Sequence, residues 1–241
     1  MMFKDLVTMA KIYAIGVGPG DPELLTRKAE RILRSVPIIC APTAGTADSS
    51  YALSIIEPLL DLEKQEVIIQ VFPMRKDQDG LEEYWETAAA EVAERVRGGS
   101  DVAFITIGDP FIYSTFLYIY RIFREKFPDI PIEIIPGVSS INAAAVAAGI
   151  PLGLGSERIA IIPAAFEEKD LRNILIDFET VVLMKVSRVF GGIYALLKEL
   201  GLEKNCAFIS RVGTAEQEVV FDLESLLGRK LDYLSLLIVK K

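Results

Sequence analysis

Asp101-Val-Ala-Phe-Ile-Thr-Ile-Gly-Asp-Pro-Phe-Ile-Tyr-Ser-Thr115 is the stretch of sequence that decides the fold. An apolar run typical of a buried strand leads into Gly108-Asp-Pro110 and then into an aromatic-rich segment with helical spacing. A second junction of this kind lies near the N-terminus, where Lys11-Ile-Tyr-Ala-Ile-Gly-Val-Gly18 precedes Pro19-Gly-Asp-Pro-Glu23. Two glycine-bearing junctions between a strand and a helix predict one shared crevice at the carboxyl ends of parallel strands.

Strands and helices are expected to alternate along the first part of the chain. Apolar runs recur at 11–18, 36–41, 67–72, 101–107 and 131–135, with helical periodicity between most of them. This pattern predicts an α/β fold with a mainly parallel sheet. Asp21 and Pro22 suit the N-cap and first position of a helix that starts at the first glycine loop.

The second part of the chain repeats the α/β rhythm. We expect strands and helices at the following places: strands near 158–164, 180–186, 206–212, 217–222 and 233–240, and helices near 167–177 and 187–200. The last two strands have little helix between them, which predicts a mixed sheet. The loose stretch Ile150-Pro-Leu-Gly-Leu-Gly-Ser156 suits a linker. We therefore expect an N-terminal extension over 1–10, an N-terminal α/β domain over 11–152 and a C-terminal α/β domain over 153–241.

Charge and composition narrow the class of function. The chain of 241 residues has 26 basic and 34 acidic residues, a net charge of -8, and no histidine. The acidic balance, without a basic patch interleaved with aromatics, argues against a nucleic-acid partner. The absence of histidine removes the commonest general base and every Ser-His or Cys-His arrangement. Chemistry at this site must need little proton transfer or take it from Tyr, Asp, Glu or Lys.

The cysteines and apolar runs indicate the compartment. Cys40 and Cys206 lie on apolar segments and are expected to be buried free thiols, with no metal site. No apolar run approaches the roughly 20 residues of a membrane span, and the N-terminus lacks a signal-peptide pattern. A cytoplasmic location without a membrane partner is the default expectation.

The glycine loops do not match the common nucleotide motifs. Gly16-Val-Gly-Pro-Gly20 has the wrong spacing for a dinucleotide fingerprint, and the chain has no phosphate loop of the G-K-S/T type. The loop could equally be a tight turn. Asp109 could accept hydrogen bonds from a ligand or cap the following helix, and the hydroxyls of Ser139 and Ser140 leave the same two alternatives open.

Five motifs, in order, resemble the tetrapyrrole methylase family. They are Gly16-Val-Gly-Pro-Gly-Asp-Pro-Glu-Leu-Leu-Thr26, Gly108-Asp-Pro110, Ile135-Pro-Gly-Val-Ser-Ser-Ile-Asn142, Gly149-Ile-Pro-Leu152 and Val181-Val-Leu-Met-Lys185. The resemblance spans nearly the whole chain from Lys11. It implies two α/β domains with a cofactor crevice between them, S-adenosylmethionine as methyl donor, a tetrapyrrole substrate and a homodimer.

Within the family, the sequence is most similar to the branch that methylates C(20) of precorrin-2 or cobalt-factor II in cobalamin biosynthesis. Tyr113-Ser-Thr115 after Gly108-Asp-Pro110 is typical of that branch, as is the small, hydroxyl-rich stretch Ala41-Pro-Thr-Ala-Gly-Thr-Ala-Asp-Ser-Ser-Tyr-Ala52. The resemblance does not distinguish the cobalt-free substrate from the cobalt-containing one. Any cobalt would come with the substrate.

The resemblance also assigns site residues. The positions that match the family's cofactor contacts are Pro19, Ile107, Gly108, Asp109, Ile112, Ser139, Ser140, Met184 and Gly213. For Met184, packing in the core is the alternative. Because a sulfonium methyl is already electrophilic, alignment of donor and acceptor is the protein's main task. Tyr113 and Asp109 are the candidates to help remove the proton from the methylated carbon.

The acidic chain and its expected acceptor would repel each other. The substrate would carry eight carboxylates, so basic side chains must gather at the site. The candidates are Arg27, Arg75, Lys76, Arg158, Lys185, Arg188 and Arg211. Each could instead be a solvated surface charge.

Two alternatives to this function stay open. One is a methyltransferase of the same family with another acceptor, such as a different corrin carbon, uroporphyrinogen III, RNA or a diphthine precursor. The other is a non-catalytic α/β protein that binds a small ligand and has kept the loops but not the activity.

Overall fold

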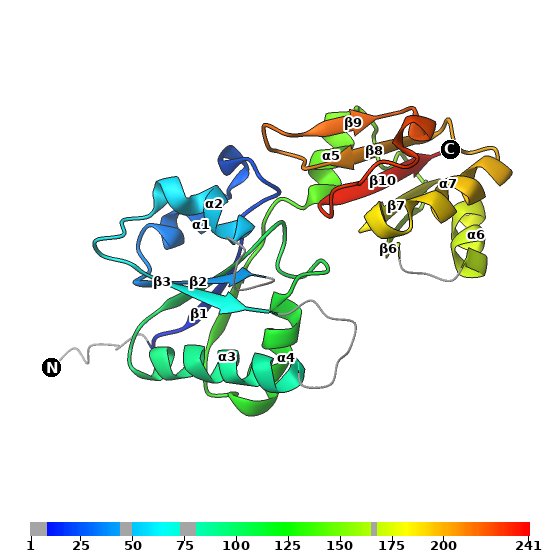
Figure 1. The fold of residues 1–241 in the computed structure, drawn as a ribbon. Coiled ribbons are helices and arrows are strands. Elements are labelled where there is room, and N and C mark those ends of the chain that lie inside the picture. Colours follow the sequence, from blue (N-terminus) through cyan, green and yellow to red (C-terminus); the bar gives the residue numbers. More distant parts are fainter. Residues whose placement is uncertain (1–8, 44–49, 73–80, 165–167) are drawn as a thin grey trace, which may run out of the picture. The chain divides into compact units, whose positions relative to one another are not determined.

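The computed structural model describes residues 9–43, 50–72, 81–164 and 168–241 (Figure 1). Arg75, Lys76 and most of the expected N-terminal extension lie outside these ranges. The chain divides into two compact units, Met1–Ser139 and Ser140–Lys241. None of the helices in the described ranges is long and apolar enough to cross a membrane.

The first unit is a parallel sheet with helices on both faces. Its strands are β1 (Ile12–Gly16), β2 (Ile38–Thr43), β3 (Glu66–Val71), β4 (Val102–Thr106) and β5 (Ile132–Ile135), in the order β3-β2-β4-β1-β5. Its helices are α1 (Arg27–Leu33), α2 (Tyr51–Ile56), α3 (Leu81–Arg97) and α4 (Phe116–Lys126), with 3₁₀ helices η1 (Pro22–Leu24) and η2 (Glu57–Leu59). All four pairings in this sheet are parallel, as the sequence predicted.

Two apolar cores explain why β4 is hydrophobic along its whole length. Alternate side chains of each strand point to opposite faces of a sheet. Helices α3 and α4 cover one face of the sheet, and α1 and α2 cover the other (Figure 1). Phe104 packs with α3 and α4, whereas Ile105 packs with α1 and α2. The neighbours β1 and β4 are therefore followed by helices on opposite faces. Ligands bind at such a switch point in open α/β sheets, beyond the carboxyl ends of the strands.

The second unit has a mixed sheet, which confirms the prediction. Its elements are α5 (Ser140–Ala148), β6 (Ile159–Pro163), α6 (Glu168–Asp177), β7 (Thr180–Met184), η3 (Val186–Arg188), α7 (Phe190–Glu199), β8 (Cys206–Ser210), β9 (Glu218–Val220), η4 (Leu223–Leu226) and β10 (Ser235–Lys240). The strand order is β6-β7-β10-β8-β9. Among the strands of this unit that the structure describes, β6 and β7 pair in parallel, and β10 is antiparallel to both β7 and β8.

The division between the units differs from the expected boundary at 152/153. It precedes α5, which the sequence analysis assigned to the N-terminal domain. The reason is packing, because Ile141 and Ala144 of α5 belong to the apolar cluster of Val182, Ile209 and other strand residues of the second sheet. The glycine-rich stretch after α5 leads from this helix into β6, within the second unit.

The first α-helix starts later than expected. Asp21 does accept a hydrogen bond from the Glu23 amide, at 2.8 Å, and Pro22 follows it. This cap serves only η1, because Leu25 and Thr26 are extended and interrupt the helix. A second cap, in which Thr26 Oγ1 accepts from the Ala29 amide at 3.2 Å, begins α1 at Arg27.

Both cysteines are buried and free, as predicted. Burial raises the pKa of the Cys40 thiol far above its usual range, and it raises the pKa of Cys206 to about 12. Both therefore stay protonated near neutral pH.

Candidate functional site

Three glycines bring the ends of β1, β4 and β5 into close contact. A Cβ atom added to Gly16 would lie 2.4 Å from the carbonyl oxygen of Gly108 and 2.7 Å from the amide nitrogen of Gly137. A Cβ atom added to Gly137 would lie 2.1 Å from the same Gly108 oxygen. No side chain fits at these separations. Glycine at these positions is therefore what allows the backbone after β1, β4 and β5 to pack together.

A short backbone bridge joins the loops that follow β1 and β4. The Gly108 amide donates to the carbonyl oxygen of Gly18 at 2.7 Å, and the Val17 amide donates to that of Thr106 at 2.9 Å. Gly18 and Gly108 have φ values of 81° and 69°, a left-handed conformation that glycine adopts without steric cost. The two glycine motifs found in the sequence thus form one structure.

The carboxylate of Asp109 fastens this structure to the segment after β5. One oxygen accepts a hydrogen bond from the Phe111 amide at 2.8 Å, and the other accepts from the Gly137 amide at 3.1 Å. Both oxygens are thus engaged with backbone. Asp109 does not cap the following helix, because α4 begins only at Phe116 and its N-cap position is Thr115. The link between Asp109 and Gly137 is a contact that the sequence did not predict.

A buried hydroxyl pair holds the other end of the loop after β4. Thr106 Oγ1 and Ser114 Oγ lie 2.9 Å apart, and Ser114 Oγ also accepts from the Phe116 amide at 3.1 Å. Both side chains are buried. The sequence analysis gave Ser114 as part of a motif and assigned it no role. The signal for its role is the spacing of eight residues between the Thr106 and Ser114 hydroxyls on either side of a glycine loop.

Tyr113 lies between these two anchors in a conformation that non-glycine residues rarely adopt. Its φ is 50° and its side chain is 42% exposed. Phe111 and Ile112 beside it are also exposed. Left-handed non-glycine residues persist where the surrounding structure holds them, and they are frequent at functional sites. Here Asp109 and Ser114 supply that support on either side.

The predicted site residues fall into two groups, one in each unit. Those on the loops after β1, β4 and β5 are Pro19, Ile107, Gly108, Asp109, Ile112, Tyr113 and Ser139. Those in the second unit are Ser140, Met184 and Gly213. Ser139 is buried and Ser140 is the first residue of α5, so both stand at the opening of a helix, as expected.

Met184 and Gly213 lie at the same edge of the second sheet. Since β7 and β8 are both antiparallel to β10, they run in one direction, and their carboxyl ends flank the start of β10. Met184 is the last residue of β7 and is partly buried against the cluster that includes Val182 and α5. Gly213 follows β8 with a φ of 82°.

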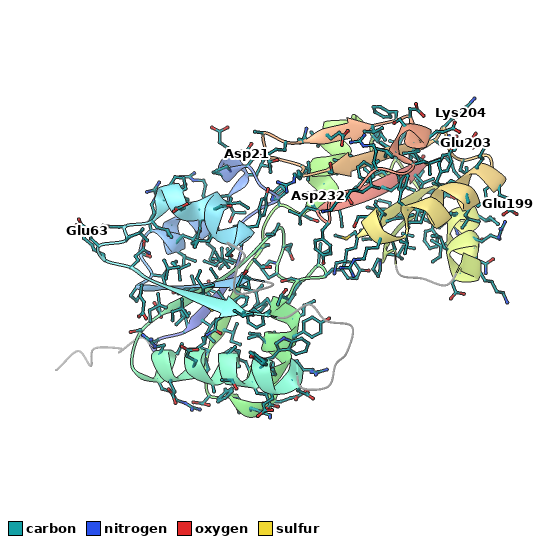
Figure 2. The ribbon with its side chains drawn as sticks, in the orientation of Figure 1. Asp21, Glu63, Glu199, Glu203, Lys204 and Asp232 are labelled. Carbon is teal, nitrogen blue, oxygen red and sulfur yellow. The ribbon has the colours of Figure 1, made fainter. Side chains whose placement is uncertain are left out.

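Two of the five basic candidates that lie in the described ranges carry a matched negative charge. Arg158 pairs with Glu179 at 3.0 Å and lowers the pKa of that carboxyl to about 2. Arg211 pairs with Asp232 at 2.7 Å, and Figure 2 shows Asp232 near the start of β10. Burial raises the pKa of Asp232, but the Arg211 hydrogen bond and the Leu234 amide lower it, and the net shift is downward.

A family model for tetrapyrrole (corrin/porphyrin) methylases matches residues 11–227. A probable cobalt-precorrin-2 C(20)-methyltransferase from Methanocaldococcus jannaschii is 36% identical over 96% of both chains. A cobalt-precorrin-2 C(20)-methyltransferase from Salmonella typhimurium is 35% identical, again over 96% of both chains. A precorrin-2 C(20)-methyltransferase from a Sinorhizobium species is 28% identical over 97% of this chain and 96% of its own.

Solved structures share the fold. A cobalt precorrin-4 methyltransferase superposes with a TM-score of 0.74 and 21% identity, over 99% of this chain and 98% of its own. The Thermus thermophilus uroporphyrin-III C-methyltransferase, solved with S-adenosylhomocysteine, gives a TM-score of 0.69 and 22% identity, over 96% and 98% of the two chains. The α/β class expected from the sequence is thereby confirmed.

Proposed function

The chain belongs to the tetrapyrrole methylase family, and from this membership we propose that it is an S-adenosylmethionine-dependent methyltransferase acting at C(20) of a precorrin-2-type corrinoid precursor. The observation that carries the proposal is the convergence of Gly16, Gly108 and Gly137 at one backbone-lined edge. Each of these glycines comes from a different motif of the family resemblance, and the fold places all three within van der Waals contact.

The residues at this edge suit the cofactor. The close packing of Gly16, Gly108 and Gly137 fixes the loops that carry the assigned residues, and a Cβ atom at Gly16 or Gly137 would displace the backbone. S-adenosylmethionine supplies an electrophilic methyl group when bound. We assign its binding to Pro19, Ile107, Gly108, Asp109 and Ile112, together with Ser139, Ser140, Met184 and Gly213. These assignments follow the family resemblance.

Within this function, Asp109 is a positioning residue. Both of its carboxylate oxygens already accept backbone hydrogen bonds, so its chief effect is to hold the Gly108 loop against Gly137. Tyr113 is the residue proposed to assist loss of the proton from the methylated carbon, because its exposed side chain lies on the loop that Asp109 and Ser114 fix. The other task of the protein is to align the methyl donor with the acceptor carbon. This task needs no histidine, which is consistent with a chain that has none.

The similarity to relatives favours the cobalt-containing substrate. The two relatives named for cobalt-precorrin-2 are 36% and 35% identical, whereas the one named for precorrin-2 is 28% identical over a similar length. We therefore propose the cobalt form as the preferred acceptor. A homodimer, a cytoplasmic location and the absence of a nucleic-acid partner are part of the same proposal.

Mass spectrometry after anaerobic incubation with S-adenosylmethionine tests the function. Precorrin-2 and cobalt-factor II are supplied in parallel, and we expect each productive acceptor to gain one methyl group, with the cobalt form reacting faster. Product NMR then places the methyl at C(20). Binding of S-adenosylhomocysteine without methylation of either acceptor would contradict the proposal and favour another acceptor or a non-catalytic role.

Replacement of Tyr113 by Phe tests its assignment. We expect kcat to fall at least about tenfold, within the range that one acid-base group contributes, while the affinity for S-adenosylhomocysteine is unchanged. A variant with unaltered kcat would remove Tyr113 from the proton transfer.

A further inference from the structure

The basic residues that could bind the acceptor's carboxylates fall into two groups, those that form an ion pair within the protein and those that do not. Arg158 and Arg211 are committed to Glu179 and Asp232. In contrast, Arg27, Lys185 and Arg188 form no ion pair with another residue in the described ranges. Most other cations in the same ranges do form one, including Lys11, Lys28 and Arg229. Lys185 and Arg188 are among the cations that form no ion pair with a residue in the described ranges, and both lie in one connection of the second unit.

Lys185 stands at the end of β7 in an unusual backbone conformation. Its φ and ψ are 61° and 40°, in the left-handed region. Its amide donates to the carbonyl oxygen of Ser235 in β10 at 3.2 Å. A left-handed conformation costs a residue with a Cβ roughly 1–2 kcal/mol, and lysine lacks the short polar side chain that reduces this cost in Asn or Asp. Glycine would fit here more easily, so a lysine at this position suggests a use of its side chain.

Arg211 occupies the matching place on the other side of β10. It follows β8 directly, its φ is 46°, and its amide donates to the carbonyl oxygen of Leu234 at 2.9 Å. The starts of the turns after β7 and β8 are therefore built alike, each from a left-handed basic residue bonded to the residues that open β10. Asp232 matches the charge of Arg211. The charge of Lys185, which is exposed, is unmatched within the described ranges.

We propose that Lys185, with Arg188 three residues further along the connection, binds a carboxylate side chain of the tetrapyrrole acceptor. The inference rests on the proposed function, which supplies an acceptor rich in carboxylates to a chain of net charge -8. Lys185 directly follows Met184, a position assigned to the cofactor, so the carboxylate is held close to the donor on the same strand end. An ammonium group offers three donors and suits one flexible carboxylate.

A matched set of variants tests this assignment. Lys185→Met removes the charge while keeping an unbranched apolar stem, and Lys185→Arg restores a charge. Lys230→Met is the control, because Lys230 is exposed in the same unit and forms no ion pair with a described residue. Equilibrium binding of cobalt-factor II is followed by its visible absorbance in the presence of S-adenosylhomocysteine, and binding of S-adenosylhomocysteine alone by calorimetry.

We expect Lys185→Met to weaken cobalt-factor II binding about tenfold, the loss of one charge-assisted hydrogen bond. Arg188→Met should weaken it by a smaller factor, whereas Lys185→Arg should restore most of the affinity. S-adenosylhomocysteine binding should be unchanged in every variant. The loss in Lys185→Met should shrink as salt rises, because screening weakens an exposed charge pair.

Three results would overturn the assignment. Equal cobalt-factor II binding by Lys185→Met and Lys230→Met would show an ordinary surface charge. A loss of S-adenosylhomocysteine affinity alone would assign Lys185 to the carboxylate of the cofactor. Wild-type protein that binds S-adenosylhomocysteine but neither binds nor methylates cobalt-factor II would instead refute the proposed function, and the assignment would fall with it.

Discussion

The carboxyl edges of the two sheets differ in the residues that occupy the left-handed backbone region. In the first unit these residues are Gly18, Gly108 and Tyr113, and the backbone at Gly16, Gly108 and Gly137 approaches so closely that side chains are excluded there. In the second unit they are Lys185, Arg211 and Gly213, of which the first two carry long cations. The first edge is therefore closely packed backbone, and the second carries long basic side chains. A methyltransferase needs both, because its cofactor must be held closely and its anionic acceptor must be attracted.

The largest expected effect comes from filling the glycine contact. Gly16→Ala places a methyl group 2.4 Å from the carbonyl oxygen of Gly108 in the loop after β4, and this backbone oxygen cannot rotate away. We expect a loss of about 3 kcal/mol in the free energy of unfolding, at the upper end for overpacking, and loss of S-adenosylhomocysteine binding. Urea denaturation and calorimetry measure the two effects.

Gly192→Ala is the matched control for this change. Nothing lies within 4 Å of a Cβ atom at Gly192 in α7. The variant should gain about 0.5–1 kcal/mol of stability, the usual difference between alanine and glycine in a helix. Similar unfolding curves for the two alanine variants would show that the strand ends can separate, and the contrast between the two edges would then lose its basis.

A smaller loss is expected when Asp109 is changed. Asp109→Ala leaves the amides of Phe111 and Gly137 without their acceptor, at a cost of about 2 kcal/mol. Asp109→Asn keeps one acceptor oxygen and should lose roughly half as much. Because the carboxylate positions backbone, the Asn variant should retain the pH dependence of kcat. A variant with normal stability and cofactor affinity but no turnover would instead indicate proton transfer by Asp109.

The hydroxyl pair gives a third, still smaller effect. Ser114→Ala and Thr106→Val each leave one buried hydroxyl without its partner, which costs about 1 kcal/mol. The double variant should cost less than the sum of the two, with a coupling of about 0.5–1 kcal/mol in a double-mutant cycle. Additive losses would mean that the two hydroxyls do not act together in holding the Tyr113 loop.

The smallest effect tests the second edge directly. Lys185→Gly removes the steric cost of the left-handed conformation but adds freedom to the unfolded chain, so we expect a net gain of about 0.5 kcal/mol. Gly108→Ala introduces the same cost at the first edge and should lose about 1 kcal/mol. Thermal unfolding should therefore shift in opposite directions for these two variants. A loss of stability in Lys185→Gly would show that the lysine side chain itself stabilises the unit.

Much of the architecture could be predicted because it depends on local patterns. Apolar periodicity located the strands of both sheets, and the lack of a helix between the last two strands indicated the mixed sheet. The boundary between the units was predicted too late in the chain, because the sequence of α5 does not show on which sheet the helix packs. The structure shows that its apolar face packs against Val182 and Ile209 of the second sheet.

The sequence by itself determined the order of strands and helices, the burial of the two thiols and the motifs that identify the family. It also showed that the reaction proceeds without a histidine. These follow from residue type and spacing along one chain. Only the tertiary structure decided that Gly137 lies against Gly16, that Asp109 holds that contact, and that Lys185 and Arg211 flank β10. Such relations depend on strand order and register between distant segments, and local spacing does not specify which strand ends become neighbours.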